Sequence, residues 1–308
     1  MSESTSPPRV GCVFRPQYAP ERLGAAARAA DASGLDEMWL WEDCFATGGI
    51  STAAIALANS DRMSVGVGVL PVPMRNVAIT AMEIATLERA FPGRVRIGVG
   101  HGVQDWMRQI GVKVASPMTY LREYLVCLSA LLRGETVTYA GRYVSLTDVQ
   151  LEWPPTSGTE LLAAATGPKT LELSGELATG TIISSGATPD GLRESLVHVN
   201  SGLARRSAPG PLHTPSLRSP LHSVAVYVVC ATGPDAEAVA KREVEQQDFA
   251  WSEDIAAFGT AAEIACAARR WVSAGADTVV LQPPSDVDTD IASFAAFIGS
   301  EVQPLLKG

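Results

Sequence analysis

The sequence is poor in paired cysteines, in clusters of basic residues and in long apolar segments. Its five cysteines are odd in number and form no CxxC pair, so we expect reduced thiols rather than a disulfide framework. A net charge of −9 without a Lys/Arg run argues against nucleic-acid binding. The N-terminal residues lack the apolar core of a signal peptide, and no apolar run reaches the ~18 residues of a membrane span. We therefore expect a cytoplasmic protein.

Several common catalytic signatures are missing as well. The chain has four histidines but no HExxH or HxH pair, which disfavours a catalytic metal. It has no GxxxxGK[ST] loop, so a nucleoside triphosphatase is not indicated. No GxGxxG follows the first expected strand at residues 10–14, which disfavours a nicotinamide-binding Rossmann domain.

Strand and helix patterns alternate along the chain. The expected strands span residues 10–14, 37–41, 63–70, 95–99, 160–165, 180–184, 223–230 and 278–282. The expected helices span residues 21–33, 52–59, 78–91, 120–132, 170–178, 236–249, 260–274 and 291–302. Eight strands with intervening helices predict an α/β fold, a single (β/α)8 TIM barrel, with a doubly wound open sheet as the alternative.

Two segments interrupt this alternation. Residues 136–139 and 143–146 flank an Ala-Gly turn and predict a small hairpin. Residues 202–222 contain four prolines and little periodicity, so we expect a Pro-rich loop insertion within one domain that covers residues 1–308.

Polar residues follow two of the expected strands directly. Glu42 and Asp43 come after the second strand, where one of them could donate a proton, or both could simply cap the next turn in solvent. Gly100, His101 and Gly102 follow the fourth strand. The two glycines allow the backbone to approach a flat ligand while one imidazole is presented, although a lone histidine is more often structural. The C-terminal ends of strands carry the chemistry in α/β proteins, so these are candidate site residues.

Two further strand ends are candidates for ligand binding. Residues 166–170 read TGPKT and join a strand to a helix, whose free N–H groups, with Lys169, would suit a phosphate. The alternative is an ordinary helix start with Pro168 in its first turn. Gly66 and Gly68 lie inside the third strand, which indicates a bulge or close ligand approach, or a barrel corner that needs small residues.

Taken together, these segments resemble the luciferase-like monooxygenase superfamily of flavin-dependent oxidoreductases. More narrowly, they are similar to its actinobacterial coenzyme F420-dependent members, which are related to methylenetetrahydromethanopterin reductase. The resemblance runs from Val10 to Gln282 and rests on residues 34–49, 65–76, 91–107, 167–180 and 259–282.

The resemblance implies a flavin or deazaflavin lying across the C-terminal ends of the barrel strands. It implies a non-prolyl cis peptide bond near Gly68–Val69 and a homodimer. It assigns Asp43, Glu42 and His101 to the reactive ring. It also assigns cofactor contacts to Gly68, Val69, Leu70, Gly100, His101, Gly102, Thr166, Gly167, Pro168, Lys169 and Thr170.

The chain departs from its relatives in two places. Sugar-phosphate dehydrogenases of this kind place a histidine where this chain has Asp43, which puts that activity in doubt. Residues 178–180 read ATG in place of a more usual Ala-Asp-Gly, so a carboxylate near the sixth strand is missing.

Three functions follow from the resemblance and stay open at this point. The first is hydride transfer between reduced F420 and a small organic acceptor. The second is an FMN-dependent monooxygenase supplied by a separate flavin reductase. The third is a non-catalytic protein that binds a flavin or deazaflavin. The sequence contains no charged cluster that would identify the substrate.

Overall fold

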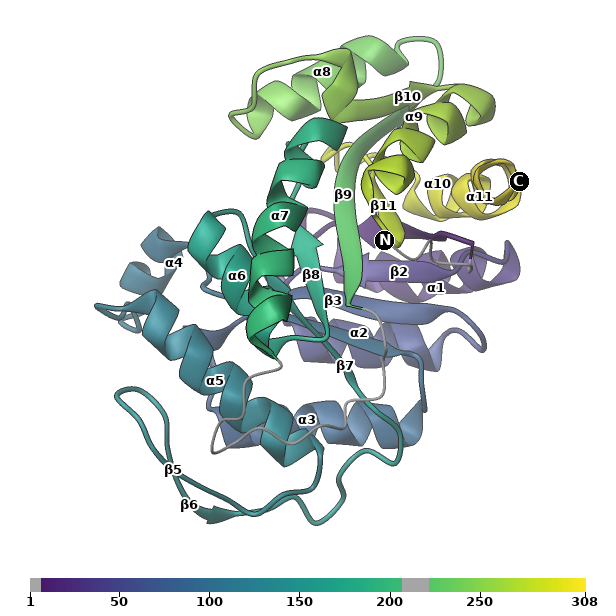
Figure 1. The fold of residues 1–308 in the computed structure, drawn as a ribbon. Helices are drawn as coiled ribbons and strands as arrows, with labels where there is room; N and C mark the ends of the chain where they lie inside the picture. Colours follow the sequence, from purple (N-terminus) through teal and green to yellow (C-terminus); the bar gives the residue numbers. More distant parts are fainter. Residues whose placement is uncertain (1–6, 207–221) are drawn as a thin grey trace.

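Eight parallel strands form a closed barrel at the centre of the molecule (Figure 1). The computed structural model describes residues 7–206 and 222–308. The ring of strands runs β1 (Arg9–Phe14), β2 (Glu37–Leu40), β3 (Ser64–Pro71), β4 (Val95–Gly100), β7 (Glu160–Ala164), β8 (Gly180–Ile183), β9 (Ser223–Thr232) and β11 (Thr278–Gln282). Because β8 pairs with β9, β9 pairs with β11 and β11 pairs with β1, these eight strands close into a ring, and the (β/α)8 barrel is confirmed over the doubly wound alternative.

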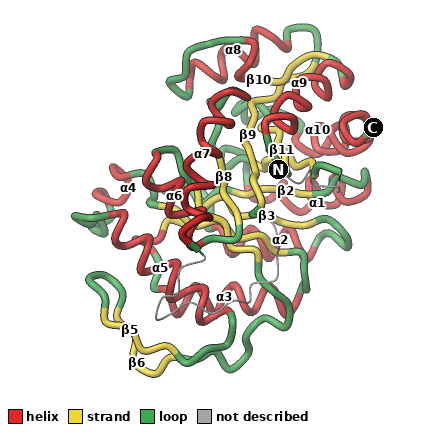
Figure 2. The backbone as a smooth tube through the Cα atoms, in the orientation of Figure 1, coloured by secondary structure: helices red, strands yellow, loops and turns green. Residues whose placement is uncertain are grey.

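Helices surround this barrel (Figure 2). They are α1 (Leu23–Ala32), α2 (Gly49–Ala58), α3 (Val77–Ala90), α4 (Gln104–Gln109), α5 (Pro117–Leu132), α6 (Pro168–Leu177), α7 (Pro189–Arg205), α8 (Ala236–Gln246), α9 (Ala261–Ala274), α10 (Ile291–Phe297) and α11 (Gln303–Lys307). Short 3-10 turns lie at Pro20–Arg22, Val72–Met74 and Glu253–Ile255, and a π turn lies at Ile298–Val302.

The predicted hairpin is confirmed as β5 (Val137–Ala140) paired with β6 (Ser145–Val149), and it extends from the barrel beside α5 (Figure 1). The capping residue Thr260 begins α9 and exchanges hydrogen bonds with Glu263. The short strand β10 (Ala256–Gly259) continues the sheet beyond the barrel by pairing with β9. The sequence patterns did not predict β10, α4, α7 or α11.

The missed helix α7 changes the expected extent of the Pro-rich loop. Because α7 continues to Arg205, residues 202–205 are helical and not part of a loop. The prolines of that expected insertion lie in residues 207–221, outside the described residues. The four prolines and the weak periodicity of residues 202–222 led to the expectation of a loop that began too early.

Gly202 allows α7 to pack against α6 with almost no space between the two backbones. A Cβ added at Gly202 would lie 2.0 Å from the carbonyl oxygen of Glu172, and one at Gly175 would lie 2.1 Å from that of Val199. Only residues without a side chain permit this approach. The position of α6, which begins at the expected phosphate loop, therefore depends on two glycines.

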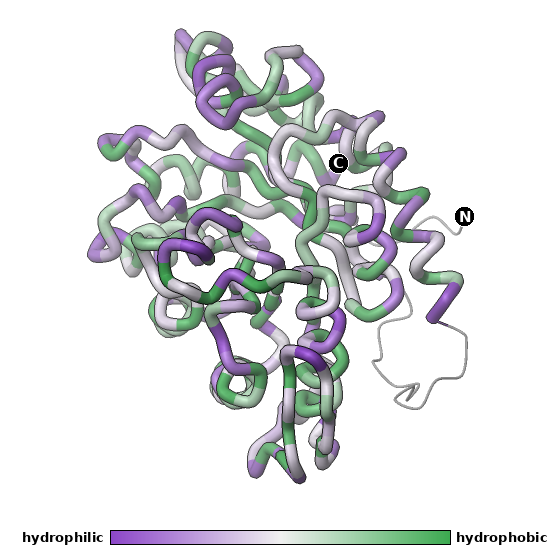
Figure 3. Tube along the Cα trace, turned by 90° about the vertical axis from the view of Figure 1, so that its left-hand side faces the viewer, coloured by the Kyte–Doolittle hydropathy of each residue, from purple (hydrophilic) through white to green (hydrophobic). Residues whose placement is uncertain are grey.

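Hydrophobic residues concentrate along the central strands, whereas hydrophilic residues gather at outer turns (Figure 3). At the N-terminal end of the barrel, Arg96 is 4% exposed and forms ion pairs of 2.7 Å with Glu37 and Glu160. Each partner of this buried network is paired, as buried charge requires. Among the described residues, no helix is both long and apolar enough to cross a membrane.

Candidate active site

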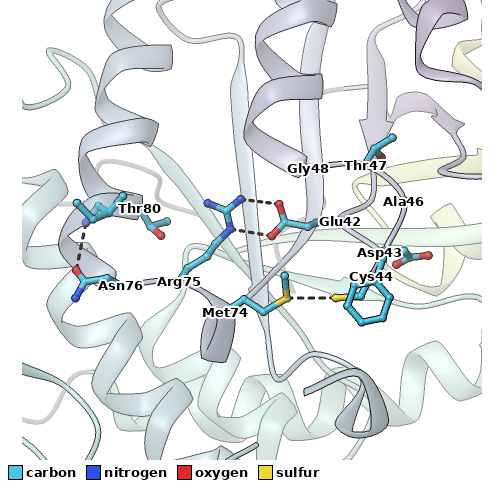
Figure 4. Close-up of a pocket in the computed structure, with 12 residues that line it drawn as sticks. Glu42, Asp43, Cys44, Ala46, Thr47, Gly48, Met74, Arg75, Asn76 and Thr80 are labelled. Carbon is cyan, nitrogen blue, oxygen red and sulfur yellow. Dashed lines mark hydrogen bonds and ion pairs between the residues drawn. The ribbon is translucent and has the colours of Figure 1, made fainter. Parts of the chain in front are cut away.

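Glu42 follows β2 and is held by three hydrogen bonds. Its carboxylate accepts from Arg75 Nε at 2.8 Å, from a terminal Arg75 nitrogen at 2.6 Å and from the backbone N–H of Gly49 at 2.6 Å (Figure 4). The side chain is 6% exposed. The pair with Arg75 is bidentate, and its two parallel N–H···O bonds fix the orientation of the carboxylate. Glu42 therefore fixes the loop after β2 to the start of α2 and to the loop before α3.

Asp43 lies next to Glu42 in a different environment. Burial raises the pKa of its carboxyl above the ordinary value, and the Arg15 guanidinium acts in the opposite direction. Asp43 lines a pocket of about 510 Å³ between the loop after β2 and the start of α3, with Cys44, Met74 and other residues (Figure 4). A half-buried carboxyl with a raised pKa beside a cavity is suited to donate a proton.

The thiol of Cys44 points across this pocket to the Met74 sulfur, which it contacts at 3.4 Å (Figure 4). Burial raises the pKa of the thiol, and the carboxylates of Glu42 and Asp43 add to the shift. This direction favours the protonated thiol, which is a poor nucleophile. The peptide bond between Cys44 and Phe45 is cis, which the sequence did not indicate.

The third strand is irregular at the position that the resemblance indicated. The bond between Gly68 and Val69 is cis, and the register between β3 and β4 shifts between Val67 and Leu70. A Cβ at Gly68 would lie 2.1 Å from the Tyr227 hydroxyl, so this side of the strand must be bare. The expected cis bond near Gly68–Val69 is confirmed.

The glycines nearby serve two different purposes. A Cβ at Gly66 would lie 2.4 Å from the Trp39 ring, so Gly66 makes room for that indole inside the barrel. A Cβ at Gly98 or at Gly100 would lie 3.0 Å from a methyl group of Val69. The β4 glycines thus accommodate the bulge, and the bulge in turn forms part of the wall at the C-terminal end of the barrel.

His101 follows β4 and reaches the start of α6. Its Nε2 lies 3.2 Å from Thr170 Oγ1, and that hydroxyl donates to the Met118 sulfur at 3.3 Å. Burial lowers the pKa of His101, which favours the neutral ring. Its Nδ1 is buried and has no hydrogen-bond partner among residues 7–206 and 222–308.

The start of α6 has the features of an anion site. Gly167 is the N-cap residue, and Pro168 has no N–H. The Thr170 N–H donates to the Gly167 carbonyl oxygen at 3.0 Å, which leaves the Lys169 N–H for another acceptor. A Cβ at Gly167 would meet nothing within 4 Å, which shows open space beside the backbone. Thr166, Pro168 and Lys169 are exposed.

Residues 5–278 match the family described as luciferase-like monooxygenase. The chain belongs to this family.

Two curated relatives show which members of the family this chain is similar to. A 5,10-methylenetetrahydromethanopterin reductase from Methanolobus tindarius is 28% identical over 180 residues, which are 58% of this chain and 55% of the relative. An F420-dependent glucose-6-phosphate dehydrogenase from Beutenbergia cavernae is 31% identical over 198 residues, 59% of this chain and 57% of the relative. The matched region thus spans somewhat more than half the length of these curated relatives.

A solved structure described as an F420-dependent secondary alcohol dehydrogenase in complex with an F420-acetone adduct superposes with a TM-score of 0.82. The two chains are 19% identical, and the match covers 98% of this chain and 99% of the other. At this identity the likeness shows that the luciferase-like fold is shared along the whole chain.

Within this luciferase-like barrel, the structure brings His101 and Thr170 into contact and places Asp43 and Glu42 on one loop. It turns Glu42 away toward Arg75, which sequence reasoning had not singled out. Arg15 was also missed, although a signal was present. It lies two residues after the interior residue Val13, so strand alternation directs it inward.

Proposed function

We propose that this chain is an F420-dependent oxidoreductase that transfers a hydride between the reduced deazaflavin and a small organic acceptor. The observation that supports it best is the β3 bulge at Gly68–Val69 beside the glycines of β4. The β4 glycines lead directly to His101, whose ring contacts Thr170 of α6. The curated relatives named above include F420-dependent enzymes.

The residues present fit a deazaflavin cofactor. A flat tricyclic ring stacks on a compact wall, which the β3 bulge would form with the Val69 side chain packed on Gly98 and Gly100. His101 Nδ1 is buried without a hydrogen-bond partner among the described residues, and the Lys169 N–H at the start of α6 would receive a phosphate of the cofactor tail. A bound deazaflavin would supply hydride chemistry at a ring carbon, and the protein would supply orientation and exclusion of water.

Asp43 is the residue that we assign to proton transfer. Its burial favours the protonated carboxyl, and it lines the cavity of about 510 Å³. The Glu42 carboxylate accepts three hydrogen bonds and fixes the loop that carries Asp43, so Glu42 is a positioning residue. The different contacts of the two adjacent carboxyl groups support this division of roles.

Fluorescence titration of the purified protein with F420 and with FMN tests the proposal. We expect micromolar or tighter binding of F420 and weaker binding of FMN. A Gly167→Val variant, which fills the space beside the start of α6, should weaken F420 binding without unfolding the barrel. Binding of neither cofactor would overturn the proposal.

The second candidate, an FMN-dependent monooxygenase supplied by a separate reductase, is supported by the family match itself. Preferential FMN binding together with oxygen uptake in the presence of reduced FMN would establish it. A non-catalytic binding protein has less support, because a cavity adjoins Asp43. The homodimer and the cytoplasmic location stay predictions, and sedimentation of the purified chain checks the former.

A further inference from the structure

A buried ion pair between Arg15 and Glu243 joins three segments at the C-terminal end of the barrel. Arg15 directly follows β1, and Glu243 lies in α8. Their charged groups are 2.7 Å apart, and both side chains are 6% exposed. The Glu243 carboxylate also accepts from the backbone N–H and from the hydroxyl of Ser285, each at 2.8 Å. Glu243 therefore holds Arg15 and the loop after β11 in one arrangement.

The guanidinium held in this way lies beside the loop that carries Asp43. It lies over the Trp41 ring, 5.6 Å from its centre, and Trp41 precedes Asp43 by two residues. Its positive charge lowers the pKa of the Asp43 carboxyl, which burial raises. Among residues 7–206 and 222–308, however, the ion pair of Arg15 is with Glu243, and no hydrogen bond joins Arg15 to Asp43. The two groups interact through space without direct contact.

Arg15 retains a donor that a direct contact with Asp43 would use. Its Nε is buried and has no hydrogen-bond partner among the described residues. Guanidinium donors bind carboxylate oxygens strongly, so a released Arg15 would turn to Asp43. An aspartate paired with an arginine is stabilised in its ionised form, which has no proton to donate. The orientation of Arg15 thus decides whether Asp43 can act as an acid.

Other titratable groups also lie around Asp43. They are Glu42 and Cys44 of its own loop, Arg75 before α3, Tyr227 of β9 and Arg15 after β1. Burial raises the pKa of both the Cys44 thiol and the Tyr227 hydroxyl, so these two groups stay uncharged. Glu42 and Arg75 are paired with each other. Arg15 is therefore the cation whose orientation matters for Asp43.

We propose that Glu243 is a positioning residue that holds the Arg15 guanidinium away from Asp43, so that Asp43 stays protonated and able to act as the acid. The inference rests on the proposed function, which gives Asp43 that role. Glu243 is not among the residues that line the pocket beside Asp43, so it acts through Arg15. Helix α8 thereby sets the protonation state of a group that it does not touch.

Releasing Arg15 tests the proposal. Glu243→Gln keeps the size of the side chain but has a single acceptor oxygen, which cannot serve Arg15 and Ser285 as the two carboxylate oxygens do. Infrared titration of the full chain against pH measures the protonated Asp43 carboxyl, and Asp43→Asn identifies its band. We expect Glu243→Gln to lower the pKa of Asp43 by about 1 or more, the effect of an arginine next to an aspartate.

Two further variants separate this effect from general damage. Glu237→Gln removes an exposed glutamate of the same helix and should leave the pKa of Asp43 unchanged. The double variant Arg15→Met/Glu243→Gln removes both buried charges together, so it should fold even if Glu243→Gln alone does not. There the pKa of Asp43 should lie above that of the wild type, because the charge that lowers it is gone.

An unchanged pKa of Asp43 in Glu243→Gln would overturn the proposal. So would a pKa at or below the wild-type value in the double variant, because the effect would then not pass through Arg15. General loosening of the structure would lower the pKa in neither pattern, since it would expose Asp43 in both variants alike. Failure to bind F420 would instead refute the proposed function, and the infrared titration without cofactor would still decide the role of Glu243.

Discussion

The close packing of α6 against α7 predicts a large effect from adding one methyl group. In Gly202→Ala, the new Cβ would lie 2.0 Å from the Glu172 carbonyl oxygen and 2.9 Å from the Glu176 nitrogen. Both are backbone atoms of a helix, so neither can rotate away. Helix propensity favours alanine by about 1 kcal/mol, whereas overpacking costs roughly 1–3 kcal/mol or more. Because the contact is with rigid backbone, we expect the upper part of that range and a net loss of about 2 kcal/mol.

The same substitution at the other end of α7 supplies the control. A Cβ at Gly191 would meet only the Thr188 hydroxyl at 3.4 Å, an ordinary contact. Gly191→Ala should therefore be neutral or stabilise the protein by up to about 1 kcal/mol. Urea unfolding of both variants measures the difference. If Gly202→Ala were as stable as Gly191→Ala, the two helices would not pack as described, and the role of Gly202 in positioning α6 would be refuted.

Three further predictions concern buried ionisable groups. Arg96→Met leaves Glu37 buried without its main partner and should lower the free energy of unfolding by about 3–5 kcal/mol in urea titrations. Asp43→Asn should lower turnover with reduced F420 about 10²-fold or more with an unchanged Kd for F420, and normal turnover would remove Asp43 as the acid. Burial raises the pKa of Glu88 to about 7 and lowers that of His222 to about 4. Stability from Glu88 is therefore lost as pH rises from 4.5 to 7, and stability from His222 is lost as pH falls from 6.5 to 4, each by up to about 3 kcal/mol. The pH dependences of stability that come from Glu88 and His222 have opposite signs. In Glu88→Gln only the His222 effect remains, so stability should rise with pH over this window, and in His222→Gln it should fall. Thermal melts at several pH values measure both trends.

The barrel itself was predictable because its strands are short apolar runs bounded by turn residues. Thr260 and Glu263 even specified the first turn of α9 through their mutual hydrogen bonds. Helix α7 was missed for a physical reason. Its glycines lower local helix propensity, and the packing that stabilises it comes from α6, a partner that local sequence does not reveal.

The sequence pattern pointed to His101 and to residues 166–170 because each follows a single strand end, and their roles in cofactor binding stay predictions. The sequence cannot separate residues whose roles depend on which partner a side chain meets. Glu42 and Asp43 are adjacent and chemically alike. Only the tertiary contact of Glu42 with Arg75 distinguishes this positioning residue from the candidate acid Asp43. Sequence spacing cannot report such a contact.

Each end of the barrel buries an arginine that is ion-paired within the protein. At the N-terminal end, Arg96 donates to the carboxylates of Glu37 and Glu160, and at the C-terminal end, Arg15 pairs with Glu243. Buried polar atoms without a partner among the described residues occur at both ends, since Thr159 Oγ1 and His222 Nδ1 stand just before β7 and β9. What distinguishes the C-terminal end is that the bulge of β3 and the pocket beside Asp43 also lie there, and this is the end at which (β/α)8 barrels bind their ligands.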